Sequence, residues 1–221
     1  MLITVAELDS FVLSPLSIPG HDWRTFLAAT AVLVFRARRG GELWADDNDK
    51  LLCWKNFVTH PSTDPKGPGF TLTIYTKTLT IPLFYPAIPG SDFCPLKLML
   101  SLKSHSPYRS LPADPIFVID SRPMRRDFMI KHTKAALLKA GISLAGKLGS
   151  KSWRAGLVTA AIRAGLPPDA IQRLGAWKSS AYQHYSELDE NDLRKDIAAI
   201  SGRTSSSPLP RPKALQAVVL R

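Results

Sequence analysis

The sequence has few cysteines, and their placement argues against a metal site. Cys53 and Cys94 are the two cysteines among 221 residues, and neither has the Cys-x-x-Cys or Cys/His spacing of a zinc ligand. We expect free thiols in a reducing compartment. Asp46, Asp47 and Asp49 do not form a calcium loop, because mid-loop glycine and the twelfth-position glutamate are missing. The sequence therefore predicts no bound metal and no cofactor.

The sequence also lacks an apolar segment long enough to cross a bilayer. Its longest apolar run, residues 26–35, falls well short of the roughly 20 residues that a spanning helix needs. Residues 1–10 have no basic segment of the kind that opens a signal peptide. We expect no membrane partner.

Acidic residues are scarce relative to basic ones. Lysine and arginine number 29 against 18 aspartates and glutamates, which gives a net charge of +11 and an isoelectric point near 9.9. Such a balance favours an extended polyanion, such as nucleic acid, as the partner. The hydrophobic content of 45% is ordinary for a globular protein that buries a sizeable core.

Apolar residues at helical spacing predict most of the chain's elements. After an extended lead-in over residues 1–20, Asp22 is a candidate N-cap for a central core helix. Further helices are expected over residues 94–105, 124–140, 154–164, 168–174 and 189–200. Residues 202–221 are expected to be a disordered basic tail that ends in a short apolar segment.

Three segments rich in β-branched and aromatic residues predict a small sheet. They span residues 51–58, 70–75 and 79–84, and Thr76-Lys77-Thr78 joins the last two as a hairpin. The predicted fold class is therefore α+β, mostly helical with a small antiparallel three-stranded sheet.

The stretch 151–187 gathers side chains that indicate chemistry. Arg154 lies at the start of one short helix, and Pro167 and Pro168 suit the opening of a second. A third helix is expected to begin near residue 179. It would carry Tyr182 and Tyr185, which are three residues apart and so share one face.

This stretch resembles a known family. The segment Leu174-Gly-Ala-Trp-Lys-Ser-Ser-Ala-Tyr-Gln-His-Tyr185 is similar to the signature Leu-Gly-x-Trp-Lys-Ser-x-Ala-Tyr-x-x-Tyr of the tyrosine recombinases, or phage integrases. The likeness is closest to forms from eukaryotic mobile elements (Crypton and DIRS-like) and covers roughly residues 23–186. In the family the last tyrosine is the nucleophile, which implies Tyr185 here and leaves Tyr182 as a packing residue.

Three further segments match the family's site. Residues 35–43 resemble its first-arginine box, where an arginine lies three residues before a glutamate, which selects Arg39 with Glu42. Lys77 corresponds to its hairpin lysine, with Lys66 as a rival placement. Lys151-Ser-Trp-Arg154 stands where the family usually has His-x-x-Arg, so lysine replaces histidine. The catalytic residues that the resemblance implies are Arg39, Lys77, Lys151, Arg154, Trp177 and Tyr185.

These residue types suit attack on a phosphodiester. Arg39 and Arg154 can clamp its non-bridging oxygens without a metal, with a fork geometry that lysine cannot copy. Tyr185 would attack the phosphorus and form a 3′-phosphotyrosyl link. Lys77 would protonate the leaving 5′-oxygen, and Trp177 would offer its indole N–H to the phosphate. Protonated Lys151 can donate to phosphate but cannot accept the tyrosine proton.

The resemblance implies a metal-independent DNA strand transferase for site-specific recombination or integration. It implies double-stranded DNA as partner, self-association on DNA and a nuclear location, with the catalytic domain over residues 21–201. The lead-in is too short for the family's helical clamp domain, so weaker DNA affinity is expected. The basic residues expected to contact DNA are Arg36, Arg38, Arg125, Arg126, Lys131, Lys134 and Lys178.

Three other interpretations stay open. The fold could grip DNA without cutting it, as a catalytically weakened protein derived from a mobile element. Residues 160–185 also have the approximate spacing of a helix-turn-helix, which would leave residues 36–42 unexplained. Last, the tryptophan and tyrosines could be core aromatics and the arginines ordinary surface charge.

Overall fold

A computed structural model describes residues 16–44, 51–65, 67–76, 79–141, 148–149 and 151–177. The segments expected to form the helix with both tyrosines, the following helix and the tail lie outside the described residues, as does most of the lead-in. In the described ranges, no helix has both the length and the apolar character needed to cross a membrane.

Helix α2 (Gly20–Phe35) is the centre of the fold. Every residue from Thr25 to Val34 is buried, so the helix is covered on all sides, as expected for a central core helix. It begins one turn earlier than predicted, after Pro19. Asp22 therefore lies in the first helical turn, and the prediction that it is the N-cap is wrong.

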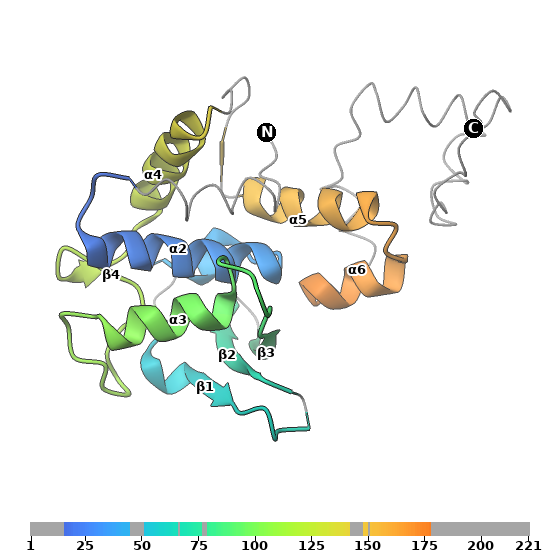
Figure 1. Ribbon diagram of the computed structural model, residues 1–221, viewed down its shortest axis with the longest axis horizontal. Coiled ribbons are helices and arrows are strands. Elements are labelled where there is room, and N and C mark those ends of the chain that lie inside the picture. The colour runs from blue at the N-terminus through green and yellow to red at the C-terminus, as the bar shows by residue number, and fades with distance from the viewer. Residues whose placement is uncertain are drawn as a thin grey trace, which may run out of the picture.

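Helices and the sheet surround α2. In Figure 1, α3 (Pro95–Ser104) runs below α2, and α5 (Ser152–Arg163) and α4 (Arg126–Lys139) lie above it. Helix α6 (Pro168–Gly175) packs on α5. These four helices lie close to their predicted ranges, because the periodic apolar residues that predicted them are the ones that pack on the core.

The antiparallel sheet has the order β1-β2-β3, formed by Phe57–His60, Gly69–Tyr75 and Thr80–Pro86. This confirms the predicted fold class. The first strand is shorter than predicted, because Trp54–Asn56 form a 3₁₀ turn in which the Asn56 side chain accepts a hydrogen bond from the Cys53 N–H.

Tyr85 anchors the sheet to the central helix. Its ring stacks on Phe70 at 4.7 Å, and its buried hydroxyl donates a hydrogen bond to the Val32 carbonyl at 3.2 Å. The sheet is thereby fixed beside the C-terminal part of α2, where the arginines of the candidate site follow.

A two-stranded hairpin closes the other end of α2. Strands β4 (Val118–Ile119) and β5 (Arg122–Pro123) pair through a turn at Asp120 and Ser121, both with positive φ. His21 and Thr25 of α2 hydrogen-bond to the Val118 carbonyl and hold the hairpin in place.

Candidate active site

The site begins where α2 ends in a tight turn. Ala37 has a left-handed conformation (φ 46°), and the Arg38 N–H bonds to the Leu33 carbonyl at 2.8 Å. A 3₁₀ helix over Gly40–Glu42 follows. Gly40 is required there, because a Cβ atom would lie 1.6 Å from the Trp44 ring. This turn buries the Arg38 side chain and leaves the Arg39 side chain exposed.

Arg38 is held by three protein partners. It is 4% exposed, its Nε donates to the Arg36 carbonyl at 2.7 Å, and a terminal nitrogen donates to the Gly175 carbonyl. Glu42 forms an ion pair with it at 3.6 Å. Burial lowers the pKa of the Arg38 guanidinium, and the Glu42 carboxylate opposes that effect.

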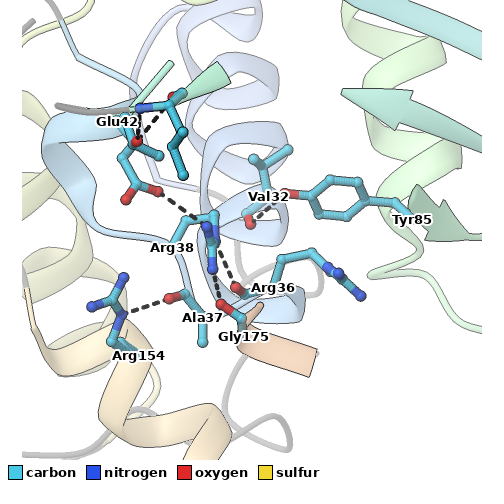
Figure 2. Close-up of polar contacts among 10 residues, drawn as sticks. Val32, Arg36, Ala37, Arg38, Glu42, Tyr85, Arg154 and Gly175 are labelled. Carbon is cyan, nitrogen blue, oxygen red and sulfur yellow. Dashed lines mark hydrogen bonds and ion pairs between the residues drawn. The ribbon is translucent and has the colours of Figure 1, made fainter. Parts of the chain in front are cut away.

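Arg154 reaches the same turn from α5. It is also 4% exposed, and its Nε donates to the Ala37 carbonyl at 2.6 Å. Arg154 thus joins α5 to the turn that carries Arg38, across 117 residues, and Arg38 joins that turn to the end of α6, across 137 residues. Figure 2 shows Arg154 joined to Ala37, and Arg38 joined to Arg36, Gly175 and Glu42.

The end of α6 completes the site. Gly175 lets the Trp177 ring fold back over the helix end, since a Cβ atom there would lie 2.1 Å from the ring. Ala176 takes a left-handed conformation (φ 49°), and the Trp177 N–H bonds to the Gln172 carbonyl at 3.0 Å. The ring then lies beside the Arg154 guanidinium, 5.7 Å from its central carbon.

Comparison with known proteins gives a consistent result for the fold. No protein-family model and no curated protein sequence matches the chain. Solved structures do match: the XerH site-specific recombinase in a post-cleavage complex with palindromic difH substrate superimposes with a TM-score of 0.62 at 16% identity. The XerA recombinase gives 0.56 at 16%, and the Tn1549 transposon integrase with circular intermediate DNA gives 0.51 at 15%. The chain has the tyrosine recombinase catalytic fold.

The match covers almost all of this chain but only part of the related structures. It includes 90% of the chain for XerH, 93% for XerA and 90% for the integrase. The corresponding shares of those structures are 52%, 66% and 65%, so the chain spans about half to two thirds of their length.

Arg38 is buried in the turn after α2, whereas Arg39, the arginine that the sequence pattern selected, is exposed. The sequence prediction chose Arg39 for its three-residue spacing to Glu42, but the ion pair to Glu42 comes from Arg38, four residues away. Residues three apart and residues four apart both lie on one face of a helical turn, so the spacing to Glu42 alone cannot distinguish Arg39 from Arg38. The left-handed turn at Ala37 decides which of the two arginines is buried beside Glu42.

Two of the alternative interpretations can be weighed against this geometry. Arg38 and Arg154 are buried, so they are not ordinary surface charge. Trp177 does pack against the core, as that interpretation held, and it faces Arg154 at the same time. Helices α5 and α6 exist as the helix-turn-helix interpretation required, but they form part of the larger recombinase fold.

The other predicted site residues divide into exposed and undescribed ones. Lys151 is exposed at the start of α5, where its carbonyl accepts the Ala155 N–H at 3.0 Å. Arg125, Arg126, Lys131 and Lys134 are exposed at the start and along α4. Outside the described residues lie Lys66, Lys77, Lys178, Tyr182 and Tyr185. The described part holds no group of three or more potential metal ligands.

The charges of this site favour an anion. Arg38 and Arg154 place two buried guanidiniums in this part of the described structure, and Glu42 forms an ion pair with Arg38. Buried guanidiniums act in a low dielectric, where their attraction to an anion exceeds that at the surface.

Proposed function

We propose that this chain breaks and rejoins DNA strands, in site-specific recombination or integration, through a 3′-phosphotyrosyl intermediate. The observation that carries the proposal is that Arg154 donates to the Ala37 carbonyl, next to Arg38, and lies against Trp177, while Arg38 donates to the Gly175 carbonyl two residues before Trp177. The XerH and Tn1549 structures with the same fold are complexes with DNA, which supports DNA as the partner.

Arg38 and Arg154 would stabilise the charge that grows on the non-bridging oxygens of the phosphodiester. Both are held by backbone carbonyls before substrate arrives, so little reorganisation is needed. Arg38 takes the role that the sequence pattern gave to Arg39, because Arg38 is buried beside the Ala37 carbonyl that Arg154 binds, whereas Arg39 is exposed. Trp177 would pack beneath the phosphate and offer its indole N–H.

Tyr185 would attack the phosphorus and keep the bond energy in the phosphotyrosyl link. It follows Trp177 by eight residues, a length of chain that reaches at most about 28 Å. Lys77, or Lys66 in its place, would protonate the leaving 5′-oxygen. Lys151 would donate to a phosphate oxygen, since its ammonium has no lone pair with which to take the tyrosine proton.

The wider assignment follows the sequence resemblance. The chain would act on double-stranded DNA as a multimer, with its catalytic domain over residues 21–201. The resemblance to Crypton and DIRS-like forms would place it in the nucleus of a eukaryotic cell. The lysine at position 151, where the family usually has histidine, supports a second candidate. This candidate is a DNA-binding protein that keeps the fold but no longer cleaves DNA.

A covalent-adduct assay separates the two candidates. The protein is mixed with a pool of nicked duplexes whose central sequence is random, and adducts are separated on a denaturing gel. We expect an adduct with the wild-type chain and none with Tyr185→Phe, which should still bind duplex. Tyr182→Phe is the matched control and should keep the adduct. Wild-type protein that binds the duplexes as a multimer without forming an adduct would support the second candidate.

A further inference from the structure

Arg36 is the third arginine of the turn after α2, and its environment differs from that of Arg38 and Arg154. Its Nε is shielded from solvent and has no hydrogen-bond partner, and no ion pair reaches its guanidinium from the described residues. Its backbone is fixed, because its carbonyl accepts the Arg38 Nε at 2.7 Å.

A half-buried guanidinium without a counter-charge is energetically costly. Burial lowers the pKa of Arg36, and the neighbouring Tyr85, a neutral phenol hydrogen-bonded to Val32, offers no negative charge. The cost is large for a fully buried charge and smaller here, because part of the side chain is exposed to water. A residue that carries this cost in the free protein is suited to an anionic ligand.

The direction of the side chain shows that this ligand is not the one held by Arg38 and Arg154. In Figure 2 the Arg36 guanidinium points toward the side of Tyr85, away from the other two arginines. Side chains from one turn thus diverge toward two positions. A DNA strand offers such a pair of anions, because its phosphates recur about every 3.4 Å along the helix axis.

We propose that Arg36 binds a second phosphate of the DNA strand, next to the phosphate held between Arg38 and Arg154. The inference rests on the proposed function and makes it more specific: the turn after α2 contacts two neighbouring phosphates. Arg36 contributes to binding and register alone. Its contact with a neighbouring phosphate would add to the affinity for DNA.

The salt dependence of duplex binding tests the inference. Each phosphate neutralised on B-DNA contributes about 0.9 to the slope of log K against log salt concentration. Arg36→Gln should lower that slope by about 0.9, and Arg36→Lys, which keeps the charge, should restore it. Arg36→Gln loses no protein partner, so its melting temperature should not fall.

Arg109 provides the matched control. It is exposed, and the adjacent Tyr108 packs on His21 at the opposite end of α2 from Arg36. Arg109→Gln removes the same charge and should keep the wild-type slope.

The possible results separate this inference from the proposed function. A slope unchanged in Arg36→Gln, or lowered equally in Arg36→Gln and Arg36→Lys, would overturn the second phosphate contact. The readout needs binding and no cleavage. A third result is that the wild-type protein forms no adduct while Arg36→Gln still lowers the salt slope. This result would contradict strand cleavage but support the second phosphate contact.

Discussion

Arg38 and Arg39 are neighbours in sequence with opposite surroundings. Arg38→Ala removes the partner of the nearly buried Glu42 and two donors to backbone carbonyls. We expect it to lower the free energy of unfolding by about 3 kcal/mol, since it leaves a buried charge uncompensated. Arg39→Ala, at an exposed position, should change it by less than about 0.5 kcal/mol. Urea denaturation measures both, and equal losses would contradict the burial of Arg38.

Ala176 carries a conformation that suits glycine. Its φ of 49° costs a residue with a Cβ atom about 1 kcal/mol or more. Ala176→Gly should therefore raise the free energy of unfolding by about 0.5 kcal/mol, after the added freedom of the unfolded chain is subtracted. Ala160→Gly, inside α5, is the control and should lower it by about 1 kcal/mol. A loss of stability in both variants would show that Ala176 is not strained.

At the scale of elements, Asp22 joins the start of α2 to the β4–β5 turn. Its carboxylate accepts the Asp120 N–H, and burial, together with the charge of Asp120, raises its pKa above the ordinary 3.8. His21, His132 and the hydrogen bond act in the opposite direction. A raised pKa means that folding takes up a proton. The stability linked to Asp22 is thus complete below about pH 3.8 and declines as pH rises through the folded-state value.

Asp22→Asn tests this linkage between two elements. The amide keeps an acceptor for the Asp120 N–H and removes the buried charge. We expect a higher melting temperature than wild type at pH 7 and the same melting temperature at pH 3. A variant that is less stable at pH 7 would show that the ionised carboxylate is favourable at this position.

Gly175 fixes the fit between the end of α6 and Trp177. Gly175→Ala places a methyl group 2.1 Å from the indole ring, so the ring must move. We expect a loss of about 2 kcal/mol, typical of overpacking, and a shifted Trp177 fluorescence. Gly149→Ala is the control, because nothing lies within 4 Å of the added Cβ. Wild-type fluorescence in Gly175→Ala would contradict the close approach.

The sequence predicted regular elements better than the turns between them. Helices α3, α5 and α6 and the strands from residue 69 to 86 follow directly from apolar period and β-branched residues. The structure places two of the predicted site residues, Arg154 and Trp177, against each other. The choice between Arg38 and Arg39 depends on a left-handed Ala37, which no propensity favours, and the 3₁₀ turn over Trp54–Asn56 depends on one side-chain hydrogen bond.

At the scale of the whole molecule, contacts across more than a hundred residues bring the site together. Helix α2 leads into the turn that carries Arg36, Arg38 and Arg39. The sheet is fixed beside this helix through Tyr85. Helix α5 carries Arg154, and Trp177 follows α6. The net charge of +11 would speed the encounter with the proposed DNA partner. The central claim is that Arg38 acts with Arg154 on the charge of one phosphate.

The most direct test compares adduct formation by wild type and Arg38→Ala, confirmed as folded by circular dichroism, on two duplexes. One has an ordinary phosphate at the cleavage position, and the other has an uncharged methylphosphonate. With the phosphate, Arg38→Ala should react about 10²–10³-fold more slowly than wild type, the cost of removing one charge-stabilising donor. With the methylphosphonate, which has no charge to stabilise, its rate should approach that of wild type. Wild-type rates of Arg38→Ala on the ordinary phosphate would contradict the account.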